Sequence, residues 1–119
     1  MRSLVTMLSA ASVALMLSGG AWAATDVVTP AQIEAAKTPA DHEAIAAAYD
    51  KEAARFEEMA KEHGAMAKTY RAAFVGTKGA NPAAMSAHCS KLAKTYKQAA
   101  EENRQLAEEH RAMAKAAGK

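Results

Sequence analysis

The sequence predicts an all-α protein built as a long antiparallel helical hairpin, coiled-coil-like, with an alanine-rich seam. Three observations support this prediction. Capping side chains stand before proline in "TPAQ" at Thr29, "TPAD" at Thr38 and "NPAA" at Asn81, a pattern that starts helices. Apolar residues then recur at spacings of three and four, and no stretch alternates as a strand would. Finally, alanine fills one heptad position in both predicted long helices.

The first 23 residues are typical of a signal peptide. Arg2 supplies a positive charge, residues 4–17 form an apolar run, and Ala21–Ala23 matches an A-x-A cleavage site. The run is too short for a helix that spans a membrane. We therefore expect the mature chain Ala24–Lys119 to be periplasmic or secreted, with no transmembrane segment.

Helix signals divide the rest of the chain. The start at Thr29 is soon interrupted by Pro39, so only a short helix fits between them. Gly76 suits the end of a helix, and the next start follows at Asn81. The predicted elements are a linker with a short helix over 24–39, and a hairpin domain over 40–117 with a helix over about 39–75, a turn over 76–81 and a helix over about 82–117.

Heptad positions define the predicted seam between the two long helices. Positions a and d alternate in the first helix as His42, Ile45, Tyr49, Glu52, Phe56, Met59, His63, Met66, Tyr70 and Ala73. In the second helix they are Met85, Cys89, Leu92, Tyr96, Ala99, Asn103, Leu106, His110 and Met113. Position e is alanine at 46, 53, 60, 67, 93, 100, 107 and 114. This repetition predicts a narrow, tightly packed contact.

The two helices also repeat one another. A shift of 47 residues superposes "EHGAMAK" at Glu62 on "EHRAMAK" at Glu109, and duplication of a helix is one explanation. Heptad phase and turn position together predict an antiparallel register with layers such as Met66–Cys89, Glu52–Asn103, Ile45–His110 and His42–Met113. A hydrogen bond between Glu52 and Asn103 would specify that register.

Composition excludes several classes of function. The net charge is +2, and acidic and basic residues are interspersed, which argues against nucleic-acid binding. The chain contains no C-x-x-C-H, H-E-x-x-H or G-x-S-x-G motif. Because no general base or nucleophile constellation is visible either, we expect a protein that is not an enzyme.

Soft metal ligands gather at two levels of the predicted hairpin. One cluster would hold His63, Met66 and Cys89 with His88 beside them, and the other His42, His110 and Met113. Thioether, thiol and imidazole suit copper, above all Cu(I), and imidazole also suits zinc. Packing is the competing interpretation, because methionine fills gaps and histidine is tolerated in coiled-coil seams. Cys89 is the one cysteine, so it stays free, pairs between chains or binds a ligand.

Assembly follows from the exposed edges of a two-helix hairpin. Two hairpins that pack into a four-helix bundle would cover these edges, so we expect a homodimer. The predicted function is a non-catalytic structural or protein-interaction module that contacts a partner in the cell envelope. The alternative is a protein that binds or buffers copper, and we expect no other cofactor. In architecture and composition the chain resembles small exported helical proteins that buffer metals or act as envelope chaperones.

Overall fold

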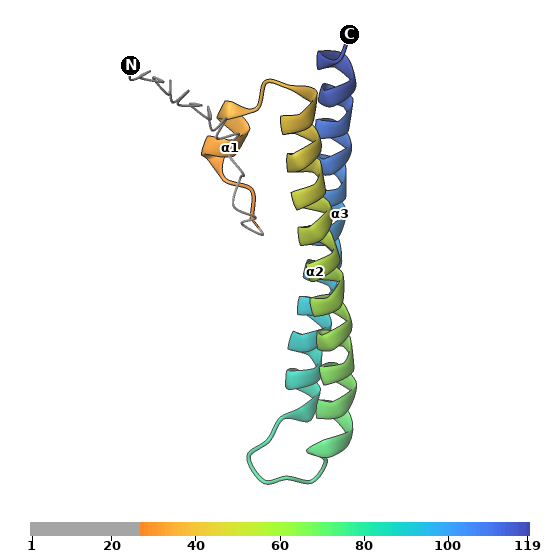
Figure 1. Cartoon of the computed structure of the whole chain (residues 1–119). Coiled ribbons are helices and arrows are strands. Elements are labelled where there is room, and N and C mark those ends of the chain that lie inside the picture. Colours follow the sequence, from red (N-terminus) through yellow and green to blue (C-terminus); the bar gives the residue numbers. More distant parts are fainter. Residues whose placement is uncertain (1–26) are drawn as a thin grey trace, which may run out of the picture.

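A computed structural model describes residues 27–119, which form three helices (Figure 1). These are α1 (Pro30–Ala35), α2 (Pro39–Ala73) and α3 (Pro82–Ala117). No strand occurs within the described range, so the predicted all-α class is confirmed for it. The predicted signal peptide and its cleavage site at Ala23 lie outside the described residues.

Side-chain caps fix where the helices begin. The Thr38 hydroxyl accepts a hydrogen bond from the Asp41 backbone N–H at 3.1 Å, and the Asp41 carboxylate accepts one from the Thr38 N–H at 2.9 Å. This reciprocal capping box satisfies two donors that would otherwise have no partner. At the start of α3, the Asn81 side-chain oxygen accepts from the Ala84 N–H at 3.0 Å. The predicted starts are confirmed because the signals that define them are local.

The connection between α2 and α3 is slightly longer than predicted. Helix α2 ends at Ala73, whereas the sequence predicts an end near 75. Two glycines in the connection, Gly76 and Gly79, have φ angles of 77° and 80°. Only glycine adopts this left-handed region without strain, which explains their use in a reversing turn.

Helices α2 and α3 run antiparallel and alongside each other, with the turn at one end and the C-terminus beside the start of α2 at the other (Figure 1). We call the end away from the turn the open end. Alanines at position e form the buried line between the helices. Its buried members are Ala46, Ala53, Ala60, Ala67, Ala100, Ala107, Ala114 and, at the same heptad position, Ser86. The predicted alanine-rich seam is confirmed.

Four residues at position d lie beside this alanine line rather than at its centre. The sequence places positions a and d in the middle of the contact, yet the exposed fractions of Met66, Leu92, Leu106 and Met113 are 41%, 40%, 43% and 45%. Ile45, Cys89 and His110, also at positions a and d, are buried as expected. On a helix, a and d stand about 40° and 100° from e, both in the same rotational direction. In an antiparallel pair, the a and d residues of both helices therefore share one side of the hairpin. We call this side the apolar face.

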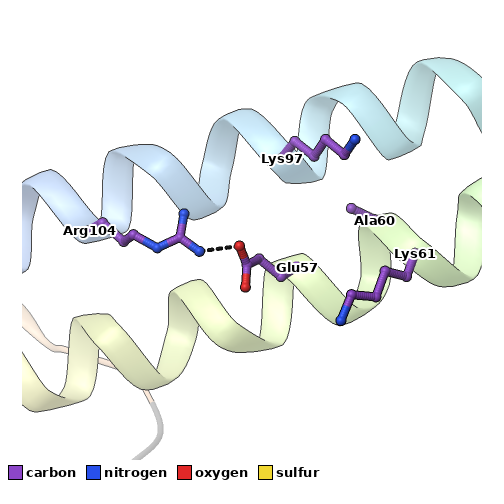
Figure 2. Close-up of a pocket in the computed structure, with 5 residues that line it drawn as sticks. All are labelled: Glu57, Ala60, Lys61, Lys97 and Arg104. Carbon is purple, nitrogen blue, oxygen red and sulfur yellow. Dashed lines mark hydrogen bonds and ion pairs between the residues drawn. The ribbon is translucent and has the colours of Figure 1, made fainter.

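The opposite side of the hairpin is charged. Arg104 pairs with Glu57, and Arg111 pairs with Asp50, each pair joining α3 to α2. Figure 2 shows the Arg104 guanidinium and the Glu57 carboxylate pointing toward each other across a shallow hollow, which Lys97 also lines. The two sides of the hairpin therefore differ sharply in polarity.

Candidate functional site

Two histidines meet near the open end of the hairpin. The Nδ1 atoms of His42, near the start of α2, and His110, late in α3, lie 3.1 Å apart. The His110 residue is only 6% exposed, and its ring centroid is 5.8 Å from that of Tyr49. At this distance one Nδ1 must carry a hydrogen and donate it while the other accepts. The histidine pair therefore constrains both tautomers.

The surroundings favour the neutral imidazole form of His110. Burial, followed by the nearby charge of His42, lowers the pKa of His110. Asp41 is next to His42 in the chain, but its carboxylate is occupied by the helix cap. The backbone N–H of Lys37, and then that of Thr38, hold the pKa of Asp41 below its usual value.

The histidine pair has the spacing of two ligands of one metal ion. Imidazole nitrogens bind zinc at about 2.0–2.1 Å, so two such bonds at an angle of about 100° span roughly 3.1 Å. Neutral imidazole is also the form that coordinates metal. Met113 follows His110 by three residues and is half-exposed on the apolar face. Within residues 27–119, no group of three or more His, Cys, Asp or Glu residues is arranged to hold a metal. Among the described residues, Met113 is the candidate third ligand.

The predicted cluster nearer the turn is less compact. The His63 ring stacks on Tyr96 with centroids 5.3 Å apart, and its Nδ1 is buried with no hydrogen-bond partner among the described residues. Cys89 is a buried free thiol, whereas Met66 is 41% exposed and His88 is exposed. The structure thus joins His42 to His110 but shows no hydrogen bond between the His63 ring and Cys89 in the described part of the chain.

Structural pairs reproduce the internal repeat. Tyr49 of α2 contacts His110 of α3, and Tyr96 of α3 contacts His63 of α2. A shift of 47 residues carries Tyr49 of α2 onto Tyr96 of α3, and the reverse shift carries His110 of α3 onto His63 of α2. The second pair is therefore equivalent to the first, with the two helices exchanged. The Arg104–Glu57 ion pair, whose members are 47 residues apart, maps onto itself under that exchange. The hairpin therefore has an approximate internal two-fold axis. The repeat is visible in the sequence, but the symmetry emerges only when the repeat is combined with the antiparallel register.

The axis runs through the apolar face. Two antiparallel helices are exchanged by a two-fold rotation only when its axis is perpendicular to the plane that contains both helices. The apolar face covers one side of that plane, so rotation about the axis maps the face onto itself. Equivalent residues such as Met66 and Met113 then stand at equal distances from its centre.

One layer near this centre departs from the expected bonding. The sequence predicts a hydrogen bond between Glu52 and Asn103, but each side chain bonds within its own helix. Arg55 donates to Glu52 Oε1 at 2.7 Å, and Asn103 Nδ2 donates to the Ala99 carbonyl at 2.8 Å. The other carboxylate oxygen, Glu52 Oε2, is buried and accepts no hydrogen bond from the described residues. Among the described residues, the apolar face therefore contains two buried polar atoms without a hydrogen-bond partner, this oxygen and His63 Nδ1.

Comparison of the chain with protein-family models, with curated proteins and with solved structures finds no match. Within the described range, no helix is both long enough and apolar enough to cross a membrane. The function is therefore argued from the geometry of the hairpin.

Proposed function

We propose that this chain is an exported, non-catalytic protein-interaction module of the cell envelope that acts through its apolar face. The partner that the face fits best is a second copy of the hairpin, and the product is a four-helix bundle. Export is supported by the signal-peptide pattern in residues 1–23.

The distribution of exposed apolar side chains carries the proposal. Four of them line one side of the α2–α3 pair: Met66, Leu92, Leu106 and Met113. The other side bears the ion pairs of Arg104 and Arg111. A contiguous apolar surface bordered by polar residues marks an interaction site, whereas scattered apolar side chains do not. The stripe follows the whole length of the hairpin, as a bundle contact requires.

Self-association is favoured over a different partner by the composition of the apolar face. An isologous dimer brings the same patch of both subunits together, so the apolar side chains of one copy would meet those of the other. Glu52 is the only Asp, Glu, Lys or Arg residue at positions a and d, so the apolar faces of two copies can meet with little charge repulsion.

Sedimentation velocity tests this proposal on the purified chain expressed with its own N-terminus. We expect a dimer for the wild type and a monomer for Leu92→Lys with Leu106→Lys. The matched control is Gln98→Lys with Ala112→Lys, which adds the same charge to exposed outward positions of α3 and should remain dimeric. A helical wild type that stays monomeric at high micromolar concentration would contradict the proposal.

Export has a separate test. The same chain, extracted from the periplasm of a bacterial host, should have the mass of Ala24–Lys119 by intact mass spectrometry. Recovery of the uncleaved chain from the cytoplasm alone would overturn the proposed location without affecting the dimer.

The second candidate function is soft-metal binding, and the His42–His110 spacing of 3.1 Å favours it. Copper would take these two nitrogens with Met113, and His63, Met66 and Cys89 would provide the second, looser set. A Cu(I) competition titration against a chromogenic chelator tests this function. His42→Gln with His110→Gln should weaken binding strongly, and Cys89→Ser should affect only the second set. Gln98→Ala, at an exposed position of α3 outside both clusters, is the matched control. A wild type that does not compete for copper would eliminate this candidate.

A further inference from the structure

We infer that two copies of the hairpin pair with their turns at the same end, so that Glu52 of each copy hydrogen-bonds Asn103 of the other. This inference rests on the self-association proposed above. It concerns the orientation of the dimer, which the apolar stripe alone leaves open.

The internal two-fold axis makes two orientations nearly equivalent. With both turns at one end, α2 of each copy faces α3 of the other, and each layer meets the same layer. With the turns at opposite ends, α2 faces α2, and each layer meets its equivalent 47 residues away. Wherever equivalent layers carry similar residues, as at Tyr49 and Tyr96 or at Met66 and Met113, the two arrangements pack alike.

The layer of Glu52 and Asn103 breaks this equivalence. The 47-residue shift carries it onto Ala99 and Phe56, which are apolar. Opposite orientation would therefore press Glu52 against Phe56 of the partner subunit and Asn103 against Ala99 of the partner subunit. Glu52 Oε2 is already buried without a hydrogen-bond partner among the described residues, and the apolar neighbours in this arrangement would offer it no donor. Burying an unsatisfied carboxylate oxygen is strongly unfavourable.

Orientation with both turns at one end offers the Glu52 carboxylate a donor once its side chain turns toward the partner subunit. Glu52 on α2 then faces Asn103 on α3 of the partner subunit, and the reciprocal pair forms across the dimer axis. Asn103 Nδ2 carries two hydrogens and donates one of them to the Ala99 carbonyl, so the other can form a second hydrogen bond. In the dimer, the two Asn103 side chains would donate to the two Glu52 carboxylates. This layer would therefore determine the orientation, as buried polar residues do in coiled coils.

Distance measurement between spin labels separates the orientations. The label is attached at Lys78→Cys in the turn, in a chain that also carries Cys89→Ser. Turns at the same end place the labels about 2 nm apart, given interhelical distances of roughly 1 nm. Turns at opposite ends place them more than about 5 nm apart, since each helix of this length extends about 5 nm. A short distance supports the inference, and a long one overturns it while leaving the dimer intact. Absence of any intermolecular distance would instead mean that the proposed self-association has failed.

A designed variant tests the cause of the orientation. Glu52→Ala with Asn103→Phe gives this layer the same residue types as its equivalent, the layer of Phe56 and Ala99. The difference between the two dimer orientations at this layer is thereby removed. We expect both distances in this variant, whereas Glu108→Ala, which deletes an exposed carboxylate away from the apolar face, should keep only the short one. If the double variant does not fold, Glu52→Leu serves instead, because it removes the acceptor alone. A short distance that persists as the single population in a folded variant lacking the acceptor would overturn the role of this layer.

Discussion

The Nδ1 atoms of His42 and His110 lie 3.1 Å apart across the open end of the hairpin. Each histidine comes from a different long helix, so their contact ties the beginning of α2 to the last turns of α3. Only one hydrogen fits between the two nitrogens. Protonating both rings would replace a hydrogen bond by a repulsion between two cations.

Stability should therefore depend on pH. The pKa of His110 is lowered in the folded state by burial and by the charge of His42, so below its ordinary value of about 6.5 the unfolded chain binds more protons than the folded one. The contribution of His110 to the free energy of unfolding is therefore fully present above about pH 6.5, the ordinary histidine pKa, and it declines as the pH falls below that pKa. We expect the free energy of unfolding, measured with urea, to decrease between pH 7.5 and pH 5.5.

Two variants isolate that effect. His110→Leu should flatten the dependence over this range, whereas Gln98→Ala, at an exposed position of α3, should leave it unchanged. An equally steep decrease in His110→Leu would assign the pH dependence to other groups.

The alanine line should tolerate no larger side chain. Ala60 is 3% exposed where α2 meets α3, and leucine at that position would force the helices apart. Overpacking of this kind typically costs about 1–3 kcal/mol. Ala60→Leu should lower the free energy of unfolding by at least about 1 kcal/mol in urea titrations followed by circular dichroism. Ala54→Leu, on the exposed side of the same helix, is the matched control and should change it by less than about 0.5 kcal/mol.

The capping box of α2 should be worth about 1 kcal/mol, the usual cost of removing a threonine N-cap. Thr38→Ala removes the hydroxyl that accepts from the Asp41 N–H. Thr69→Ala provides the comparison, since that hydroxyl only donates back to the Ala65 carbonyl within the helix and alanine is the better helix former. Thermal unfolding should therefore occur at a lower temperature for Thr38→Ala alone. Equal losses in both variants would show that the cap contributes nothing of its own.

Local signals made the helix starts and the register predictable. Proline after a capping residue marks the beginning of a helix without any tertiary information, and the structure begins α2 at Pro39 and α3 at Pro82. The register followed from heptad phase and turn position. His110 contacts both His42 and Tyr49, one turn to either side of Ile45, the residue predicted to share its layer.

Tertiary effects made the remainder unpredictable. Alanine contributes little hydrophobic area, so its position did not stand out as the centre of the contact, although its small size allows the closest approach. The sequence predicted one cluster of His42, His110 and Met113, but the direct contact between the two histidine rings depends on long side chains that reach between adjacent layers. Glu52 and Asn103 share a predicted layer yet bond within their own helices, since nearby groups compete with a partner across the seam.

Gly64 should lower the stability of α2 without a compensating structural role. It lies inside the helix, and a Cβ built on it meets nothing within 4 Å, so alanine would fit without strain. Gly64→Ala should raise the free energy of unfolding by about 0.5–1 kcal/mol, because glycine loses more conformational freedom on folding. Gly79→Ala should have the opposite effect, since its φ of 80° disfavours any side chain although the space around it is equally open. Urea titration of the two variants checks both signs. Gly64 lies at heptad position b, away from the apolar face, so its substitution should leave the sedimentation coefficient of the proposed dimer unchanged. A stabilised variant that no longer dimerises would place the self-association surface on the wrong side of the hairpin.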